Sequence, residues 1–173
     1  MAMDATDHFA QQANLFEIWI LQSSTQGGQF AREAVQHLMQ LYLAALELPA
    51  PWSDGLANAP ETPRIGDEEQ HRVLHALGVR LPFDAYGIVF DPLILPPEEC
   101  SIGSLADDLL DIYRDVVTGL REYERGRRAN ALWEWGLSFQ QHWGYHATAA
   151  IRSLHNWLAS EELDRLSQSS KSE

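Results

Sequence analysis

Four aspartates and two histidines, in two consecutive segments of helical pattern, are the residues of this chain whose types and spacing could do chemistry. They are Asp107, Asp108, Asp111 and Asp115, followed by His142 and His146. Two imidazoles four residues apart share one face of a helix and can ligate one metal ion, for which carboxylates are common co-ligands. The pattern therefore indicates either a divalent-metal site or a polar lock between two helices.

The four aspartates are not equivalent on a helical wheel. Asp107 points nearly opposite the apolar stripe of its helix, whereas Asp108 and Asp115 lie on the flank of that stripe with Asp111 between them. Asp107 is therefore expected in solvent, where it complements the helix dipole. The candidate metal ligands are Asp108, Asp111 and Asp115, together with both histidines, although a solvated acidic face bordered by ordinary core-edge histidines fits the same pattern.

Gly126 separates the two helical segments and supplies the left-handed residue that commonly ends a helix. If the helices are antiparallel neighbours, residues equally distant from this turn lie at equal height, at about 1.5 Å of rise per residue. Asp111 is then level with about His142, and Asp108 with about His146. We expect each pair to meet directly or through a metal or water. A direct pair favours the charged imidazolium, whereas a metal requires the neutral ring.

The elements that must position these residues follow from hydrophobic spacing and from the prolines. All eight prolines lie between Pro49 and Pro97, so the stretches before and after contain no outright helix breaker. Apolar stripes at helical spacing run through residues 9–20, 34–46, 73–77, 105–123 and about 129–158. The second helix carries two adjacent stripes and is predicted to be central to the core. Ser104 is expected to cap the fourth helix, and Asp67 with Gln70 to form a capping box on the third.

The middle of the chain is expected to be irregular. Residues 49–64 form a proline-rich loop that is longer than the usual connection. The short apolar runs 86–90 and 93–95 favour extended chain lying over the helices rather than strands. We therefore predict an all-α fold, an antiparallel up-down bundle of about five helices with an irregular proline-rich insertion. It is expected to form one domain over residues 1–166, with a disordered tail at 167–173.

Composition restricts the partners. The formal net charge of −13 repels the phosphate backbone that dominates nucleic-acid affinity. No apolar run approaches the ~20 residues needed to span a bilayer, and the N-terminal residues lack the pattern of a secretory signal. A lone Cys100 cannot form an intrachain disulfide, which agrees with a reducing compartment. We predict a cytoplasmic protein that binds neither nucleic acid nor membrane.

A second group of candidate binding residues surrounds the Gly126 turn. The acidic balance of the chain is reversed there by Arg121, Arg125, Arg127 and Arg128. An anion or acidic partner could stabilise the arginines that begin the last helix. The favoured alternative is a solvated turn in which the arginines pair with Glu122 and Glu124.

Trp135 is the one tryptophan of the last predicted helix that sits toward the His142 side. A partly exposed tryptophan beside polar groups is typical of a ligand pocket or a protein interface. Together with the wide apolar helix faces, it suggests a homodimer.

Known catalytic motifs are incomplete or absent. Residues 107–111 match the DDxxD pattern that binds magnesium in prenyl-diphosphate enzymes, but those enzymes need a much larger helical cavity and usually a second acidic motif. A carboxylate-bridged di-iron bundle needs two E-x-x-H units, and only residues 68–71 fit. The sequence contains no phosphate loop, dinucleotide fingerprint or nucleophile elbow. Cys100 has no histidine nearby that would serve as its base.

Four segments occur in an order that resembles a known family. Residues 86–92, 104–115, 132–135 and 142–146 together are similar to a bacterial family known only as a domain of unknown function, number 5063. The resemblance covers the second half of the chain strongly and the first half loosely. It implies an all-helical bacterial protein, and it brings no activity, cofactor or catalytic residue with it.

The residues favour a binding function. We expect a helical-bundle protein that binds another protein or a small ligand without catalysis, because no catalytic motif is assembled. The alternative is a metal-dependent hydrolase with its Asp/His site between the fourth and fifth helices, where the metal activates water. A divalent metal is the only cofactor that the sequence suggests.

Overall fold

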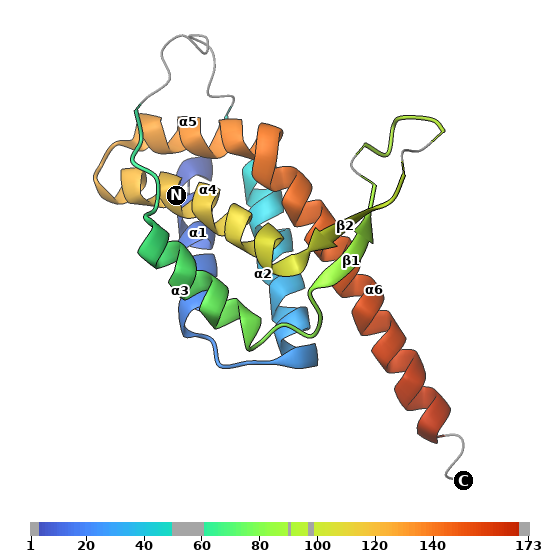
Figure 1. The fold of residues 1–173 in the computed structure, drawn as a ribbon. Helices are drawn as coiled ribbons and strands as arrows, with labels where there is room; N and C mark the ends of the chain where they lie inside the picture. Colours follow the sequence, from blue (N-terminus) through green and yellow to red (C-terminus); the bar gives the residue numbers. More distant parts are fainter. Residues whose placement is uncertain (1–3, 50–60, 90, 97–98, 170–173) are drawn as a thin grey trace.

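Helices dominate the structure, a computed structural model that describes residues 4–49, 61–89, 91–96 and 99–169 (Figure 1). They are α1 (Ala5–Gln22), α2 (Gly27–Leu46), α3 (Asp67–Gly78), α4 (Leu105–Glu124), α5 (Arg128–Ser138) and α6 (Gly144–Ser169). A π-helical turn, Phe139–Trp143, joins α5 to α6. The strands β1 (Ala85–Ile88) and β2 (Ser101–Ser104) form one antiparallel pair. The predicted all-α class is confirmed.

The core lies where the apolar faces of α1, α2, α4 and the α5–α6 pair meet. The predicted stripe of α1 is fully buried, and so is most of that of α4. In α2 the first predicted stripe is buried, whereas the second is split. Val35 and Tyr42 are partly buried against the core, but Met39 is 49% exposed and Leu46 62% exposed. Helix α2 packs against both α1 and α6, so its predicted central place in the core is confirmed.

The last predicted helix is interrupted where its direction changes (Figure 1). The π turn places one extra residue in the helical backbone between α5 and α6. Gly144 makes this possible, because a Cβ there would collide with the carbonyl oxygen of Phe139. A single straight helix over 129–158, as the sequence predicts, is therefore wrong. The interruption carries both histidines, since His142 lies in the π turn and His146 in the first turn of α6.

Helix α5 lies very close to α4 because Gly119 has no side chain. A Cβ at Gly119 would collide with the Nε1 edge of the Trp135 indole. That ring is fully buried, and its Nε1 donates a hydrogen bond to the carbonyl oxygen of Val116 at 2.8 Å. The close contact fixes α5 and the π turn against the middle of α4, which carries the aspartates.

Residues 86–88 of the predicted extended chain at 86–90 instead belong to a strand. β1 pairs with β2 in the register Ala85↔Ser104 to Ile88↔Ser101. The run 93–95 lies in turns and bends, as expected for irregular chain. Strand β2 has the sequence Ser-Ile-Gly-Ser, which shows little strand pattern and leads directly into α4. Gly103 is needed there, because a Cβ would lie 2.8 Å from the ring of Tyr86.

Helix ends follow the predictions in part. The Ser104 hydroxyl accepts the backbone N–H of Asp107 at 3.2 Å, so the predicted cap of α4 is confirmed. The capping box on α3 is wrong, because Gly66 occupies the cap position and the Gln70 side chain donates to the carbonyl of Ile65.

The predicted disordered tail and the predicted proline-rich loop lie only partly within the described residues. Helix α6 continues to Ser169, so the first three residues of the predicted disordered tail are helical. Residues 170–173, and most of the predicted loop at 49–64, lie outside the described residues. Within the described helices, none is both long and apolar enough to cross a membrane.

Candidate metal site and adjoining cavity

The fold brings the five predicted metal-site residues together along the seam between α4 and the π turn with α6. Asp108 Oδ1 lies 2.8 Å from His146 Nδ1, which confirms the predicted pairing of these two residues. His142 Nδ1 instead lies 2.7 Å from Asp115 Oδ2, so a direct pairing of His142 with Asp111 is wrong. The alternative of a contact through a metal stays open, because ligating atoms of Asp111 and His142 lie within 4.8 Å of each other. The extra residue of the π turn is one cause, because it leaves His142 closer to the Gly126 turn than a regular helix would.

Both partner carboxylates are buried and are held on their second oxygen as well. The side chain of Asp108 is 8% exposed and that of Asp115 12% exposed. The Tyr86 hydroxyl donates to Asp108 Oδ2 at 2.5 Å, and Arg64 Nη1 lies 3.9 Å from Asp115 Oδ1. Burial, followed by the hydrogen bond to the carboxylate, raises the pKa of Tyr86 far above its ordinary value. Asp108 is therefore held through both oxygens, and each carboxylate is placed to orient an imidazole.

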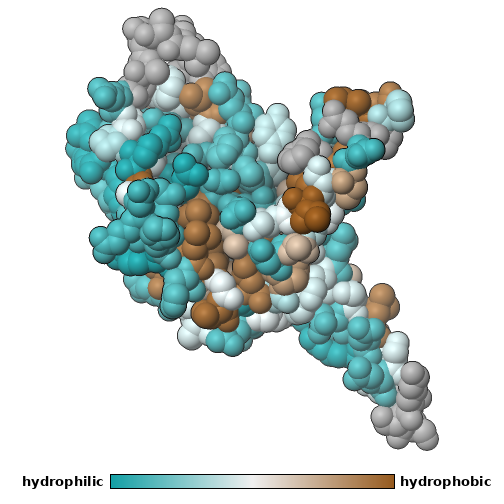
Figure 2. Space-filling view, viewed as in Figure 1, coloured by the Kyte–Doolittle hydropathy of each residue, from teal (hydrophilic) through white to brown (hydrophobic). Residues whose placement is uncertain are grey.

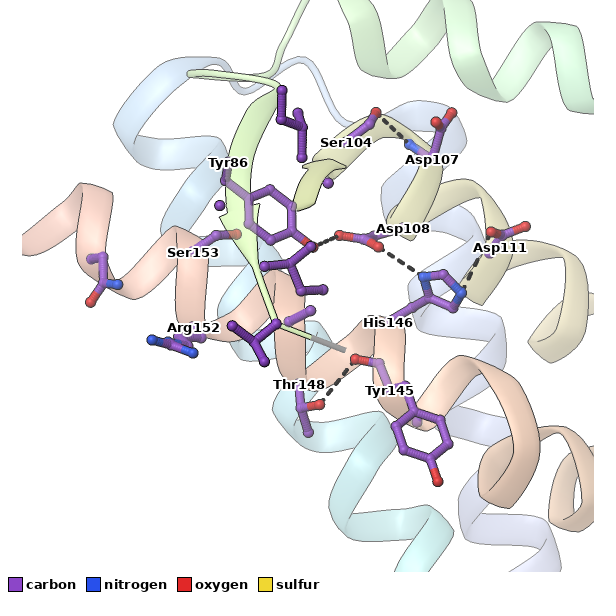
Figure 3. Close-up of a pocket in the computed structure, with 18 of the residues that line it drawn as sticks. Tyr86, Ser104, Asp107, Asp108, Asp111, Tyr145, His146, Thr148, Arg152 and Ser153 are labelled. Atoms are coloured by element: carbon purple, nitrogen blue, oxygen red, sulfur yellow. Dashed lines mark hydrogen bonds and ion pairs between the residues drawn. The ribbon is translucent and has the colours of Figure 1, made fainter. Parts of the chain in front are cut away.

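The orientation of the histidines leaves their Nε2 atoms for another partner. His146 Nε2 lies 3.6 Å from Asp111 Oδ2, and the two imidazole centroids are 4.7 Å apart. One ligating atom from each of Asp111, His142 and His146 falls within 4.8 Å of the others. Two atoms that each lie ~2.1 Å from one metal ion are at most ~4.2 Å apart. A small side-chain rotation would therefore bring the three atoms close enough to bind one cation. Figure 3 shows the chain of contacts from Tyr86 through Asp108 and His146 to Asp111.

This donor set fits a transition metal. Two imidazole nitrogens and one carboxylate oxygen suit zinc, manganese or ferrous iron better than calcium or magnesium, which favour all-oxygen sites. Histidine ligands in proteins usually donate their other ring N–H to a carboxylate, which fixes the tautomer. Asp108 and Asp115 occupy that position behind the rings, so the five residues fall into three potential ligands and two that hold them.

The same residues form a stable polar contact when no metal is bound. The hydrogen bond to Asp108 raises the pKa of His146 above its ordinary value near 6.5, against the opposing effect of burial. The charges of Asp108, Asp111 and Asp115 act in the same direction as the hydrogen bond. His146 is thereby stabilised as an imidazolium between α4 and α6. Both alternatives drawn from the sequence, a metal site and an inter-helix lock, are thus compatible with one geometry.

A cavity of about 1380 Å³ adjoins the cluster and is formed by the β1–β2 hairpin, α4 and α6. Asp108, Asp111 and His146 line one part of it. Aromatic side chains from α2, α6, the π turn and the segment before β1 contribute to the rest, namely Tyr42, Phe83, Phe139 and Trp157. Figure 2 shows apolar surface on the projecting hairpin and its connecting loop, where Ile102 is 85% exposed. The cavity therefore combines a polar end with largely apolar walls, as small-molecule sites commonly do.

Sequence reasoning missed three residues of the site. Tyr86 reaches Asp108 across 22 positions of the chain, and no local pattern indicates that contact. Arg64 lies 3.2 Å from Glu134, a carboxylate that is only 4% exposed. Glu134 interrupts an apolar stretch between two tryptophans, a signal that could have marked it as a buried charge needing a partner.

The second group of predicted binding residues is already satisfied within the chain. Arg125 and Arg127 both pair with Glu122, which is 1% exposed and whose pKa is lowered to about 2, chiefly by the Arg127 hydrogen bonds. Arg128 pairs with Asp4 at 2.6 Å and also with Asp7. Arg121 pairs with Glu124 at 3.3 Å. The paired-arginine alternative is therefore confirmed for both Glu122 and Glu124.

Trp135 is not a surface residue. Its side chain is 0% exposed, so the prediction of a partly exposed tryptophan is wrong. The cause is the close approach of α5 to α4 at Gly119, which the sequence of α5 alone does not reveal.

The fold and the site define an all-α protein with an aspartate–histidine cluster at a helix seam beside a large cavity. The chain matches, over residues 2–160, the family described as domain of unknown function DUF5063, and it belongs to that family. The structure is similar to the crystal structure of a Bacteroides fragilis protein from a structural genomics consortium. The TM-score is 0.70 at 22% identity, covering 88% of this chain and 91% of that chain, a likeness that shows the fold alone. No curated protein matches the chain.

Proposed function

We propose that this protein binds a small ligand in the cavity beside α6 and that a divalent transition metal, held by Asp111, His142 and His146, forms one end of the binding site. The observation that carries the proposal is the orientation of the two imidazoles. Each has its Nδ1 on a buried carboxylate, at 2.7 Å and 2.8 Å, so each keeps Nε2 for a metal. Three protein ligands leave a coordination position open, and the bordering cavity gives a ligand access to it.

Metal binding is the first step to test. Isothermal titration with Zn²⁺ and Mn²⁺, after treatment with a chelator, should give one site per chain. Asp111→Asn and His146→Gln should each weaken the metal at least about tenfold, because each removes one of three ligands. Asp107→Asn is the matched control, since Asp107 is exposed on the same helix and points away from the imidazoles. A chain that binds neither ion, or variants that bind as tightly as the parent, would overturn the proposal.

A second candidate function is metal-dependent hydrolysis of the bound ligand. It is favoured by one observation, that Asp111 and His146 line the cavity, so a water on their metal would face the ligand. Such a metal lowers the pKa of its water and generates a nucleophile near neutral pH. Turnover of p-nitrophenyl acetate or p-nitrophenyl phosphate by the zinc or manganese form, abolished in Asp111→Asn, would support hydrolysis. Tight metal binding without turnover favours the binding function alone.

The homodimer expected from the sequence stays a prediction. Apolar side chains of α2 are exposed, among them Met39, Leu43 and Leu46. Light scattering at high protein concentration tests this point, and a monomer there would remove it.

A further inference from the structure

Arg152 is the only arginine or lysine among the described residues that line the cavity. The other formally charged residues of the lining are Asp107, Asp108 and Asp111, all on α4. The chain as a whole has 25 acidic and only 12 basic side chains. A single guanidinium in the wall of a cavity is a specific feature in such an acidic protein, because it is the one side chain of the described lining that keeps a positive charge at every physiological pH.

Arg152 forms no ion pair with a carboxylate in the described part of the chain. The arginines of the Gly126 turn differ, because Glu122, Asp4 and Asp7 neutralise them. Arg165, further along α6, pairs with Glu162 at 3.3 Å. The five N–H donors of Arg152 are therefore available to a bound molecule, and a guanidinium binds carboxylate or phosphate in a bidentate manner.

The positions along α6 place Arg152 at a definite distance from the metal end. It follows His146 by six residues, which corresponds to roughly 9 Å along the helix axis. Figure 3 shows Arg152 well apart from His146 and Asp111 on the pocket wall, with Ser153 nearby. Between the two ends, α6 contributes the small Thr148 and Ala149 to the lining, and the hairpin contributes Ile88 and Ile102. The Thr148 hydroxyl donates to the carbonyl oxygen of Tyr145. The stretch of α6 between the two ends therefore adds no large side chain, and the hairpin offers apolar contacts.

We propose that the ligand is an elongated molecule with two acidic groups, of which one binds the metal and the other binds Arg152, and with an apolar segment between them. This inference rests on the proposed function and names its ligand class. A carboxylate or a phosphate satisfies Arg152, and Asn156, which also lines the cavity one turn further along α6, supplies an additional donor. The apolar segment contacts the hairpin.

The test compares matched probes on the zinc-loaded protein. The diacids hexanedioate, octanedioate and decanedioate are titrated against the monoacids hexanoate, octanoate and decanoate, which share their chain lengths. At least one diacid should bind about tenfold more tightly than its monoacid, the strength expected of one added charge-assisted contact. Arg152→Gln should remove this difference and leave monoacid affinity and zinc affinity unchanged. Arg165→Gln, on the same helix outside the cavity lining, is the control and should keep the difference.

The outcomes separate this inference from the proposed function. If zinc binds but no diacid exceeds its monoacid, or if Arg152→Gln retains the preference, the ligand class is wrong while the metal site stands. If zinc does not bind but diacids still bind in an Arg152-dependent manner, the Arg152 subsite stands and the metal proposal falls. If neither zinc nor any diacid binds, both are overturned.

Discussion

Asp108→Asn is the most informative substitution in the cluster because it keeps the shape of the side chain and removes its charge. In the structure Asp108 accepts from Tyr86 through one oxygen and from His146 through the other. Asparagine retains one carbonyl oxygen, which can still accept the Nδ1 proton. Its NH₂ group then takes the place of Asp108 Oδ2, which lies 2.5 Å from the Tyr86 hydroxyl oxygen. Because the NH₂ group can only donate, the Tyr86 hydroxyl must accept a hydrogen bond instead of donating one.

Two quantities should change together. The pKa of His146 should fall, because the hydrogen bond to Asp108 is the largest cause of its elevation. Metal affinity should fall about 10- to 100-fold, the usual cost of removing a carboxylate that orients a ligating histidine. The imidazole becomes a poorer and less well oriented ligand, although the three proposed metal ligands themselves are unchanged.

The assays are NMR titration of the His146 ring protons in the metal-free protein and isothermal titration with Zn²⁺. Asp107→Asn serves again as the control, because Asp107 is exposed and its carboxylate contacts neither imidazole. If Asp108→Asn changes zinc affinity by less than about twofold while Asp111→Asn abolishes binding, Asp108 does not orient the ligand. An unchanged His146 titration would refute the electrostatic part of the reasoning.

Three further predictions address pH and the glycines. Because the folded pKa of His146 is raised, its contribution to stability is complete below pH ~6.5 and is lost as pH rises through the folded pKa. Urea unfolding of the metal-free protein across pH 5–9 should show this loss. Zinc affinity should rise over the same pH range, because the metal needs the neutral ring. Gly119→Ala should cost ~1–3 kcal/mol in urea unfolding, since its Cβ meets the buried Trp135. Gly144→Ala should cost a similar ~1–3 kcal/mol by colliding with the Phe139 carbonyl, and it should also weaken zinc binding by displacing the π turn.

Each of these three predictions, on pH, Gly119→Ala and Gly144→Ala, has a control or an outcome that would contradict it. Gly78→Ala is matched to the two glycine substitutions, because nothing lies within 4 Å of a Cβ there, and it should be neutral or slightly stabilising. Gly119→Ala or Gly144→Ala behaving like Gly78→Ala would show that the close contacts are absent in solution. A pH profile unaltered by Asp108→Asn would show that the facing charges of Asp108, Asp111 and Asp115 do not govern His146.

Much of the fold follows from local periodicity. The stripe of Phe9, Ala13, Phe16 and Ile20 is buried as predicted, because a 3.6-residue repeat determines which face of a helix is apolar. The pairing of Asp108 with His146 was also predictable, since it needs only an antiparallel turn and a known rise per residue.

The rest depends on contacts between distant segments. The burial of Trp135 requires a missing side chain at Gly119 on another helix, and the pairing of His142 with Asp115 depends on a π turn that Gly144 permits. The contact of Tyr86 with Asp108 depends on a strand whose partner sequence carries little strand pattern. None of these is encoded within a single window of the chain, so periodicity could not reveal them.

The same contacts explain how the proposed site would exchange a proton for a metal with little rearrangement. In the metal-free protein, protonation of His146 places a positive charge between α4 and α6, against Asp108 and Asp111. A metal ion at Nε2 would replace that proton with its own positive charge, while the Nδ1 contact to Asp108 stays in place. Because Tyr86 also holds Asp108, the hairpin wall of the cavity is linked to the ligating ring in both states. Metal occupancy should therefore alter the charge at the polar end of the cavity far more than its shape.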